Sequence, residues 1–299
     1  MVKSLDDLVN MAKAAGPRTC AVVAAEDPEV LLAADEAARL GVARCILVGD
    51  AAGIEKAASE AGVDLSGYEL VEERDGATAA RKGVEMVKAG EADLLMKGLV
   101  NTADVLRAVL DKEIGLRTGR LLSHLSVFEA PGLGRLLMFS DGAMNIAPTL
   151  AEKAQITQNA IDVAHAIGIV EPRVAALAAI EHVNPDMPAT IDAACLAKMS
   201  ERGQIKGGIV DGPLALDNAI SPDAAQHKGI AGPVAGRADI LIVPDIEAGN
   251  VFYKALVYLA GAYAASVVVG AKAPVVVTSR SDSHVAKVCS LALGVLLAG

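Results

Sequence analysis

The strongest constraint on the fold is an alternation, along the whole chain, of short aliphatic runs with alanine-rich segments of helical period. Such alternation is typical of parallel βαβ units, in which a helix follows each strand and covers the sheet. The sequence therefore predicts an α/β fold with parallel or mixed sheets and flanking helices. The predicted strands are 20–24, 44–48, 69–72, 93–96, 125–128, 136–139, 174–180, 208–210, 240–243, 266–269 and 275–278.

The predicted helices lie between these strands, and several start or stop at capping residues. Asp27 precedes Pro28, and a proline fits the first helical turn because its missing N–H is not needed there. Gly41 and Gly168 follow helical runs, as left-handed C-terminal caps do. The predicted helices are 28–40, 76–89, 102–112, 149–167, 189–199 and 248–264, with a further helix after the last strand.

The length of 299 residues corresponds to about two domains at roughly 150 residues each. No low-complexity tail, long proline-rich linker or repeat of fixed period marks a boundary. The best candidate boundary is the Pro131-Gly132-Leu133-Gly134 segment near the middle of the chain.

The composition limits the classes of partner. Acidic residues outnumber basic ones by 37 to 27, aromatic residues make up 2%, and there is no Trp. A nucleic-acid-binding protein needs a basic stripe and aromatic stacking platforms, so we expect no nucleic-acid partner. A local group of two or three cations is still enough to hold an anion such as phosphate.

Cysteine usage and hydropathy predict a cytoplasmic protein with no membrane partner. The four cysteines are isolated, which is typical of buried, reduced thiols in the cytosol. The chain starts with an acidic segment and lacks the apolar core of a signal peptide. Its longest uncharged stretch, 255–271, is rich in Ala and Gly and is short for a membrane span. We expect a buried helix there that turns into a strand.

Five polar clusters follow predicted strands, where ligands bind in parallel sheets. They suggest a cleft between two domains. They are Lys97-Gly98 with Asn101, Thr102 and Arg107; Ser140 to Asn145; Asp211-Gly212-Pro213 with Asp217 and Asn218; Pro244 to Asn250; and Thr278 to His284.

The last cluster opens the C-terminal helix and is the best candidate anion site. A helix N-terminus offers free N–H donors and a positive dipole end. A hydroxyl from Ser279 and the guanidinium of Arg280 complete a site for phosphate or a phosphorylated substrate. The same residues also fit a second interpretation, in which the serines only cap the helix and Arg280 is a surface charge.

Several common functional motifs are absent. The chain contains neither G-x-x-x-x-G-K-[ST] nor G-x-G-x-x-G, so ordinary P-loop and dinucleotide fingerprints are missing. It also lacks the G-x-S-x-G elbow of serine hydrolases. The five histidines show no H-x-x-x-H spacing, and with isolated cysteines this predicts no metal site.

Four of these segments resemble motifs of one enzyme family. The runs Asp141–Pro148, Asp211–Asn218, Pro244–Asn250 and Ser279–Ser283 are similar, in order and spacing, to those of the phosphate acetyltransferase and butyryltransferase family, nearer its butyryl branch. The resemblance covers nearly the whole chain. It implies a fold like that of isocitrate and isopropylmalate dehydrogenases.

The resemblance also implies a domain arrangement. It predicts a discontinuous first domain of residues 1–131 plus 270–299, a second domain of residues 132–269, and an active-site cleft between them. It further implies a homodimer or higher homo-oligomer.

The implied reaction is reversible transfer of a short acyl group, acetyl to butyryl, between coenzyme A and phosphate, without a covalent enzyme intermediate. Acyl-CoA or CoA and phosphate or acyl phosphate are therefore the expected small-molecule partners, and no cofactor is expected beyond coenzyme A as substrate. The implied catalytic residues are Ser279, Arg280 and Asp282. The implied substrate-binding residues are Arg107, Asn145, Asp211, Glu247, Asn250 and Ser283.

One position departs from the family pattern. The acetyl branch carries a catalytic aspartate six residues beyond the arginine, and this chain has Ala286 there. Asp282 is the nearest acid and the candidate replacement base. A thiol with a pKa near 8.5 is only a few per cent thiolate at pH 7, so a positioned base helps, whereas an ordinary aspartate is a weak base for the task. The alternative is that positioning and anion stabilisation suffice without a base.

Two other functions are open on the sequence alone. A metal- and NAD(P)-dependent dehydrogenase on the same architecture would need spaced aspartates and a nicotinamide site. A CoA-binding or sensor protein with impaired catalysis is consistent with Ala286.

Overall fold

The structure is a computed structural model that describes residues 2–279 and 282–299. The chain divides into two units. The terminal unit comprises Leu5–Arg120 and Ala264–Gly299, and the central unit comprises residues 2–4 and Leu121–Tyr263. The domain limits expected from the sequence, at 131/132 and 269/270, stay a prediction.

The terminal unit is built on a sheet in the order β3-β2-β1-β4-β11-β10. Its strands are β1 (Arg18–Val23), β2 (Ala43–Gly49), β3 (Glu69–Glu72), β4 (Leu94–Lys97), β10 (Tyr263–Val269) and β11 (Val275–Val276). Neighbouring strands run parallel except β10, which is antiparallel to β11. Its helices are α1 (Leu5–Ala15), α2 (Pro28–Leu40), α3 (Ala51–Ala61), α4 (Gly76–Ala89), α5 (Thr102–Val109) and α11 (His284–Leu297), with a short 3-10 turn at Leu65–Gly67.

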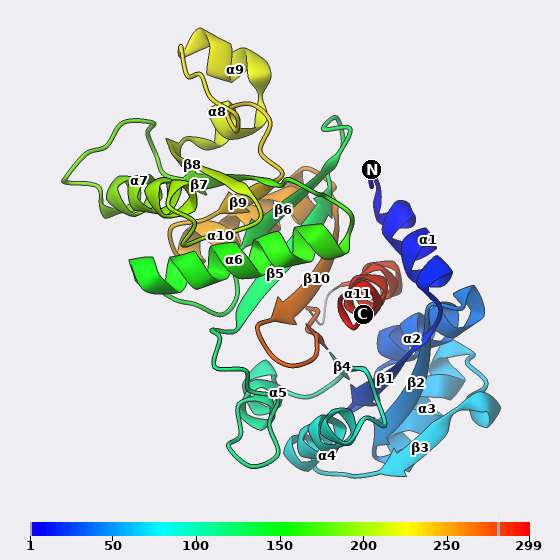
Figure 1. The fold of residues 1–299 in the computed structure, drawn as a ribbon. Coiled ribbons are helices and arrows are strands. Elements are labelled where there is room, and N and C mark those ends of the chain that lie inside the picture. The colour runs from blue at the N-terminus through cyan, green and yellow to red at the C-terminus, as the bar shows by residue number, and fades with distance from the viewer. Residues whose placement is uncertain (1, 280–281) are drawn as a thin grey trace. The chain divides into compact units, whose positions relative to one another are not determined.

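Helices cover both faces of this sheet. Successive side chains of a strand point to opposite faces, so two neighbouring residues of β4 identify the helix on each face. Leu95 of β4 faces α4, where a Cβ added to Gly83 would lie 2.7 Å from Leu95 Cδ1. Leu94 faces α11, where a Cβ added to Gly294 would lie 2.7 Å from Leu94 Cδ1. Apolar residues of α2, α3 and α11 share one buried cluster with Leu94. The three helices are labelled in Figure 1. The start of α11 therefore lies at the carboxyl end of the sheet's middle strands.

The central unit has a mixed sheet in the order β5-β6-β9-β7-β8. Its strands are β5 (Ser123–Glu129), β6 (Leu136–Ser140), β7 (Arg173–Leu177), β8 (Ile209–Leu214) and β9 (Ile240–Ile242), of which only the β5–β6 pair is antiparallel among the described residues. Its helices are α6 (Leu150–Ala166), α7 (Pro188–Glu201), α8 (Leu216–Ile220), α9 (Pro222–His227) and α10 (Ile246–Lys254), followed by a π-helical turn at Ala255–Leu259.

Four of the seven aromatic residues of the chain pack together where α10 meets β5 and β6. Phe128 and Phe139 stack with ring centroids 5.5 Å apart. Tyr253 meets Phe128 edge-on at 5.4 Å, and Phe252 meets Phe139 edge-on at the same distance. This packing fixes α10 against β5 and β6.

Most of the predicted elements are confirmed. All the predicted strands are present, and the Asp27 side chain accepts the Val30 N–H at 3.0 Å at the start of α2. The largest errors in extent concern two elements. The helix expected to run to residue 264 ends at Leu259, because Gly261 takes a left-handed φ of 66° before β10 begins. The strand expected at 208–210 continues as β8 to Leu214.

Two expectations about burial need correction. Residues 258–261 of the uncharged stretch 255–271 are exposed rather than buried, with Tyr258 66% and Leu259 86% exposed. Cys195 is only half-buried, whereas the other three cysteines are buried as expected. Burial raises the pKa of the Cys20 thiol. Among the described residues, no helix is both long and apolar enough to cross a bilayer.

Candidate functional site

The loop before α11 holds the residues predicted to bind phosphate, of which Arg280 lies outside the described residues. Ser279 and Asp282 form a closed turn: the Ser279 N–H donates to Asp282 Oδ2 at 2.8 Å, and the Asp282 N–H donates to the Ser279 carbonyl at 3.2 Å. Ser283 caps α11, and its Oγ accepts the Ala286 N–H at 3.4 Å. The Asp282 carboxylate thus shapes the loop, whatever its part in proton transfer.

An acidic side chain from α2 contacts the same helix start. The His284 N–H, the first of α11, donates to Glu29 Oε2 at 2.6 Å. The His284 ring lies between two carboxylates, with Nδ1 3.4 Å from Glu29 Oε2 and Nε2 3.8 Å from Glu36 Oε2. One of the N–H groups expected to face a bound oxyanion is therefore occupied by Glu29.

Two buried lysines belong to this end of the sheet. Lys97, at the end of β4, is 5% exposed, and its ammonium donates to the carbonyls of Gly98 at 3.1 Å and Val100 at 3.2 Å. Lys287, on α11, is 2% exposed and donates to the Asp282 carbonyl. Sequence reasoning included Lys97 in a polar cluster and missed Lys287, whose only signal was a charge within an aliphatic helix.

Arg107 projects from α5, a helix of the same unit, as a largely exposed side chain. Its side chain is 73% exposed, and Nη1 lies 2.5 Å from Asp104 Oδ1, one turn earlier on the helix. Exposed ion pairs of this type are weak, so the guanidinium is available to an anion at little cost. Its predicted contact with substrate stays a prediction.

In the central unit, Asp141 organises the loop that follows β6. It is 2% exposed, and its carboxylate accepts four hydrogen bonds. Oδ1 accepts the N–H groups of Ala143 at 2.9 Å and Met144 at 3.0 Å, while Oδ2 accepts the His124 N–H at 3.0 Å and Asn145 Nδ2 at 2.6 Å. A buried carboxylate is stable only with such partners.

Asn145 and Asn250, both predicted to bind substrate, come together around this loop. Asn145 Nδ2 also donates to the Leu122 carbonyl at 3.0 Å, and Asn250 Nδ2 donates to the Gly142 carbonyl at 3.2 Å. Both N–H groups of Asn145 and one of Asn250 therefore hold the loop, which leaves the two Oδ1 atoms and the second Asn250 N–H as groups able to meet a ligand.

Two glycines allow this approach. A Cβ on Gly249 would lie 2.6 Å from Gly142 Cα, and a Cβ on Gly142 would lie 2.9 Å from the Gly249 carbonyl carbon. Backbone atoms cannot give way at such distances, so only glycine fits at both positions. The Asp141-Gly142 and Gly249-Asn250 motifs are thus two halves of one contact between the β6 loop and α10.

Two other predicted site residues of the central unit lie outside that contact. Glu247 is exposed on the first turn of α10, which Asp245 caps by accepting the Ala248 N–H at 2.8 Å. Asp211 lies within β8 rather than after a strand, paired in register with Ala175 of β7. The expectation of a post-strand cluster at Asp211 was therefore wrong. The strand can continue through Pro213 because β8 is the edge strand of this unit, where a missing N–H breaks no hydrogen bond between strands.

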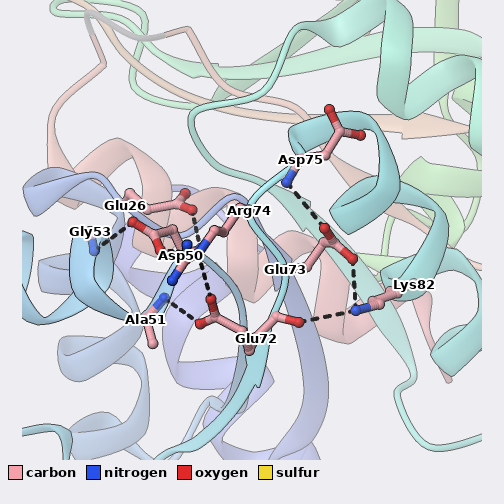
Figure 2. Close-up of polar contacts among 9 residues, drawn as sticks. All are labelled: Glu26, Asp50, Ala51, Gly53, Glu72, Glu73, Arg74, Asp75 and Lys82. Carbon is pink, nitrogen blue, oxygen red and sulfur yellow. Dashed lines mark hydrogen bonds and ion pairs between the residues drawn. The ribbon is translucent and has the colours of Figure 1, made fainter.

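The carboxyl ends of β1, β2 and β3 carry a network of acidic residues (Figure 2). At the start of α3, Glu26 Oε1 accepts the Asp50 N–H at 2.5 Å, Glu72 Oε2 accepts the Ala51 N–H at 2.8 Å, and Asp50 Oδ2 accepts the Gly53 N–H at 3.1 Å. The chain's own carboxylates therefore occupy the N–H donors of this helix start, which in other proteins are free to bind anions.

The same network contains two cations that lower carboxyl pKa values. The Ala51 N–H, and after it Arg74, lowers the pKa of Glu72, and the Lys82 ammonium lowers the pKa of Glu73. Arg74 Nε lies 3.1 Å from Glu72 Oε1, and Lys82 Nζ lies 2.8 Å from Glu73 Oε2 (Figure 2). In the part of the chain that the structure describes, no group of three or more His, Cys, Asp or Glu side chains is arranged to hold a metal ion.

Comparison with known proteins gives a family match and similar relatives. A family model described as "Phosphate acetyl/butaryl transferase" matches residues 74–295. Phosphate butyryltransferase from Clostridium acetobutylicum is 51% identical over 299 residues, covering 100% of this chain and 99% of that protein. Phosphate acetyltransferase from Thermotoga maritima is 46% identical over 294 residues, covering 98% of this chain and 99% of that protein.

Solved structures agree with the fold. A branched-chain phosphotransacylase from Enterococcus faecalis superposes with a TM-score of 0.83 at 34% identity, covering 94% of this chain and 99% of that chain. A protein described as a 4-hydroxythreonine-4-phosphate dehydrogenase from Salmonella typhimurium gives a TM-score of 0.56 at 12% identity over 94% of this chain and 98% of that chain, a likeness of fold alone. The predicted α/β fold with dehydrogenase-like architecture is confirmed.

Proposed function

This chain belongs to the phosphate acetyl/butyryl transferase family, and we propose that it transfers a short acyl group between coenzyme A and phosphate within a ternary complex. The chain is an acyltransferase. The observation that carries the proposal is similarity along the full length to relatives named for this activity, including all four motif segments. The structure supports it by joining two of those motifs, through Gly142 and Gly249, in one contact.

The proposed step balances without a covalent enzyme intermediate. A phosphate oxygen attacks the thioester carbonyl carbon, a C–O bond forms, and the C–S bond breaks as coenzyme A leaves and takes up a proton. In the reverse direction, the coenzyme A thiolate attacks the carbonyl of the acyl phosphate. Ser279 and Arg280 hold the phosphoryl group and stabilise the charge that develops.

The other predicted residues take supporting roles in this proposal. Arg107 is a second anion contact. Asn145 and Asn250 present their Oδ1 atoms to the substrate, while their amide N–H groups fix the loop. Asp211, Glu247 and Ser283 complete the proposed substrate-binding set. The reaction needs no resident cofactor in this proposal, because coenzyme A is a substrate.

Positioning and anion stabilisation carry more of the rate enhancement than a general base does. Holding two substrates in line is worth about 7–11 kcal/mol of the barrier, whereas a base contributes about 10²–10⁴-fold. Asp282 is a candidate base, but its carboxylate already accepts the Ser279 N–H at 2.8 Å. We therefore assign the larger effect to the groups that hold the anion.

A thiol-release assay tests the activity directly. We expect free coenzyme A to appear from acetyl-CoA, propionyl-CoA or butyryl-CoA only when phosphate is present, because phosphate is the attacking group. The rates rank the three acyl chains. Each methylene that contacts an apolar pocket is worth about 1–3 kcal/mol, so the rates for successive chain lengths should differ by about 10–200-fold.

The same assay separates the two alternative functions. A sensor with impaired catalysis would bind butyryl-CoA but release no thiol on addition of phosphate. A dehydrogenase would change the absorbance of NAD(P) with a divalent metal and release no thiol. Either outcome would contradict the proposed transfer.

We also propose that the protein self-associates as a homodimer or higher homo-oligomer. Large apolar side chains are exposed along one stretch of the central unit: Val251 is 68% exposed, Leu259 is 86% exposed and Tyr263 is 63% exposed. Apolar patches of this kind favour protein–protein contacts. The expected cytoplasmic location stays a prediction.

Leu259→Glu tests this face. We expect light scattering to show a smaller assembly for the variant than for the unmodified protein, because the substitution would bury a charge in the contact. Val170→Glu is the matched control, since Val170 is 88% exposed on another part of the unit. If the two variants had equal masses, the face around Leu259 would be excluded as the contact between subunits.

A further inference from the structure

Asp211 is a half-buried carboxylate whose capacity to accept hydrogen bonds is largely unused. Its Oδ1 accepts the N–H of Gly212, the next residue in the chain, at 2.8 Å. Its Oδ2 accepts no hydrogen bond from residues 2–279 and 282–299, and this atom keeps contact with solvent. The buried carboxylate of Asp141, in the same unit, accepts four hydrogen bonds. Asp211 therefore has acceptor positions left for a ligand that donates hydrogen bonds.

The sheet places Asp211 on the face that α10 covers. Residues directly opposite one another on neighbouring strands point to the same face of a sheet. Asp211 lies opposite Ala175 of β7, and Ala175 lies opposite Leu241 of β9. Leu241 lies opposite Phe139 of β6, whose ring meets Phe252 of α10 edge-on. Asp211 thus shares a face of the central sheet with the helix that carries two other predicted substrate-binding residues.

A loop that contains three glycines approaches the open oxygen of Asp211. This loop spans residues 229–236 and follows α9, and a Cβ added to Gly232 would lie 2.9 Å from Asp211 Oδ2. Gly232 also has a φ of 154°, which residues with a side chain rarely adopt. The far end of the loop is held where the Gly236 N–H donates to the Asn218 carbonyl at 2.7 Å. Glycine at position 232 therefore keeps open the space beside Oδ2 that a side chain would fill.

The charges beside this loop favour an uncharged donor over an anion. The ammonium of Lys228, which precedes the loop, lies 3.0 Å from Asp217 Oδ2 and 3.5 Å from Glu181 Oε2. Two carboxylates share this one cation, so it supplies no surplus positive charge to a ligand near Asp211. A phosphate group at Asp211 would meet repulsion, because like charges a few ångströms apart disfavour one another. Of the two proposed substrates, coenzyme A is the one that carries uncharged N–H and O–H donors.

We propose that Asp211 binds coenzyme A through an uncharged N–H or O–H donor, in the space that Gly232 leaves beside its Oδ2. The inference rests on the proposed function, because coenzyme A is a substrate there. The donor belongs either to the pantetheine arm, with its amides and hydroxyl, or to the adenosine, with its amine and ribose hydroxyl. These two sources share the same chemistry and are separated by the last experiment below.

Asp211→Ala tests the contact by calorimetric titration with coenzyme A, which needs no turnover. We expect the Kd to rise by at least about tenfold, because a hydrogen bond to a charged acceptor is lost. The KM for phosphate should change by less than about threefold. Asp211→Asn keeps an acceptor without the charge, so its Kd should rise less. If Asp211 only repelled the phosphates of coenzyme A, both substitutions would lower the Kd, which would contradict the proposal.

Gly232→Ala tests the space beside the carboxylate independently. Its methyl group would lie 2.9 Å from Asp211 Oδ2, so we expect the Kd for coenzyme A to rise by at least about tenfold. Gly229→Ala is the matched control, because Gly229 lies in the same loop with a positive φ of 67°, but a Cβ there meets no described atom within 4 Å. Both variants should lose thermal stability through backbone strain. Only Gly232→Ala should lose affinity, a difference that strain alone would not produce.

Titration with the two halves of coenzyme A, pantetheine and the adenosine bisphosphate, locates the donor. Asp211→Ala should weaken binding of one half and leave the other unchanged. An unchanged Kd for coenzyme A in both Asp211→Ala and Gly232→Ala would overturn the inference, as would weakened binding of neither half. Failure of both Asp211 variants to fold would assign the carboxylate to the fold and also overturn it. If the unmodified protein bound coenzyme A but released no thiol from butyryl-CoA with phosphate, the proposed function would fail, a result that the titrations cannot imitate.

Discussion

Arg280→Ala is expected to lower kcat/KM for phosphate by about 10²–10³-fold, and Asp282→Asn by less than about tenfold. The first value is what enzymes lose when one preorganised group that stabilises developing negative charge is removed. The measurement is initial-rate thiol release with butyryl-CoA at varied phosphate concentration. The order of the two effects decides whether anion stabilisation or base catalysis is the larger contribution.

The smaller effect at Asp282 follows from its geometry. Its Oδ2 accepts the Ser279 N–H at 2.8 Å and so maintains the turn that presents Ser279. Asparagine keeps a side-chain oxygen that can accept the same N–H, so the loop is preserved while the capacity to take a proton is lost. Any activity that Asp282→Asn loses therefore reports on proton transfer rather than on loop shape.

Arg39→Ala is a suitable control for loss of an arginine in the same unit. Arg39 is 70% exposed on α2 and pairs with Asp35 on the same helix at 2.9 Å. Such a pair contributes about 0.3–0.5 kcal/mol, so the variant should keep its activity. A larger loss for Asp282→Asn than for Arg280→Ala would reverse the ranking and make Asp282 the essential base.

Local patterns predicted most of the fold because they depend on short-range physics. The start of α2 at Pro28 follows from the Asp27 cap and from a proline that needs no N–H partner. The extent of β8 was harder to predict, because Asp211-Gly212-Pro213 has the composition of a turn. Only the sheet order, which makes β8 an edge strand, explains why the strand continues through a proline.

The candidate site was only partly predictable for the same reason. Ser279, Asp282 and Ser283 are near neighbours in sequence, and their joint turn and helix cap could be anticipated. The Gly142–Gly249 approach joins segments about one hundred residues apart and depends on β6 and β9 being parallel neighbours. The burial of Lys287 is likewise a tertiary effect, since a lysine in an aliphatic helix gives no sign of which way it faces.

Asp141→Ala is expected to lower the free energy of unfolding by about 3–5 kcal/mol. Each buried donor left without an acceptor costs about 1–3 kcal/mol. This substitution removes the acceptor of four donors, three of which are only part-buried and can regain part of the loss by binding water. The His124 N–H is the most costly of them, because His124 is only 7% exposed and water cannot easily replace the carboxylate. Urea unfolding followed by circular dichroism measures the loss, since the chain has no Trp for fluorescence.

Asp245→Ala provides the comparison between a carboxylate that accepts four hydrogen bonds and one that only caps a helix. Asp245 also lies in a motif loop, but its side chain acts as a helix cap that accepts the Ala248 N–H at 2.8 Å, so its loss should cost about 0.5–2 kcal/mol. A loss of unfolding free energy at Asp141 no greater than at Asp245 would show that the buried carboxylate is dispensable.

Because Asp141 accepts Asn145 Nδ2 and shapes the loop whose Gly142 carbonyl accepts Asn250 Nδ2, the Asp141→Ala substitution should also release both asparagines. Activity should then fall further than global unfolding alone accounts for, at temperatures where most of the protein is still folded.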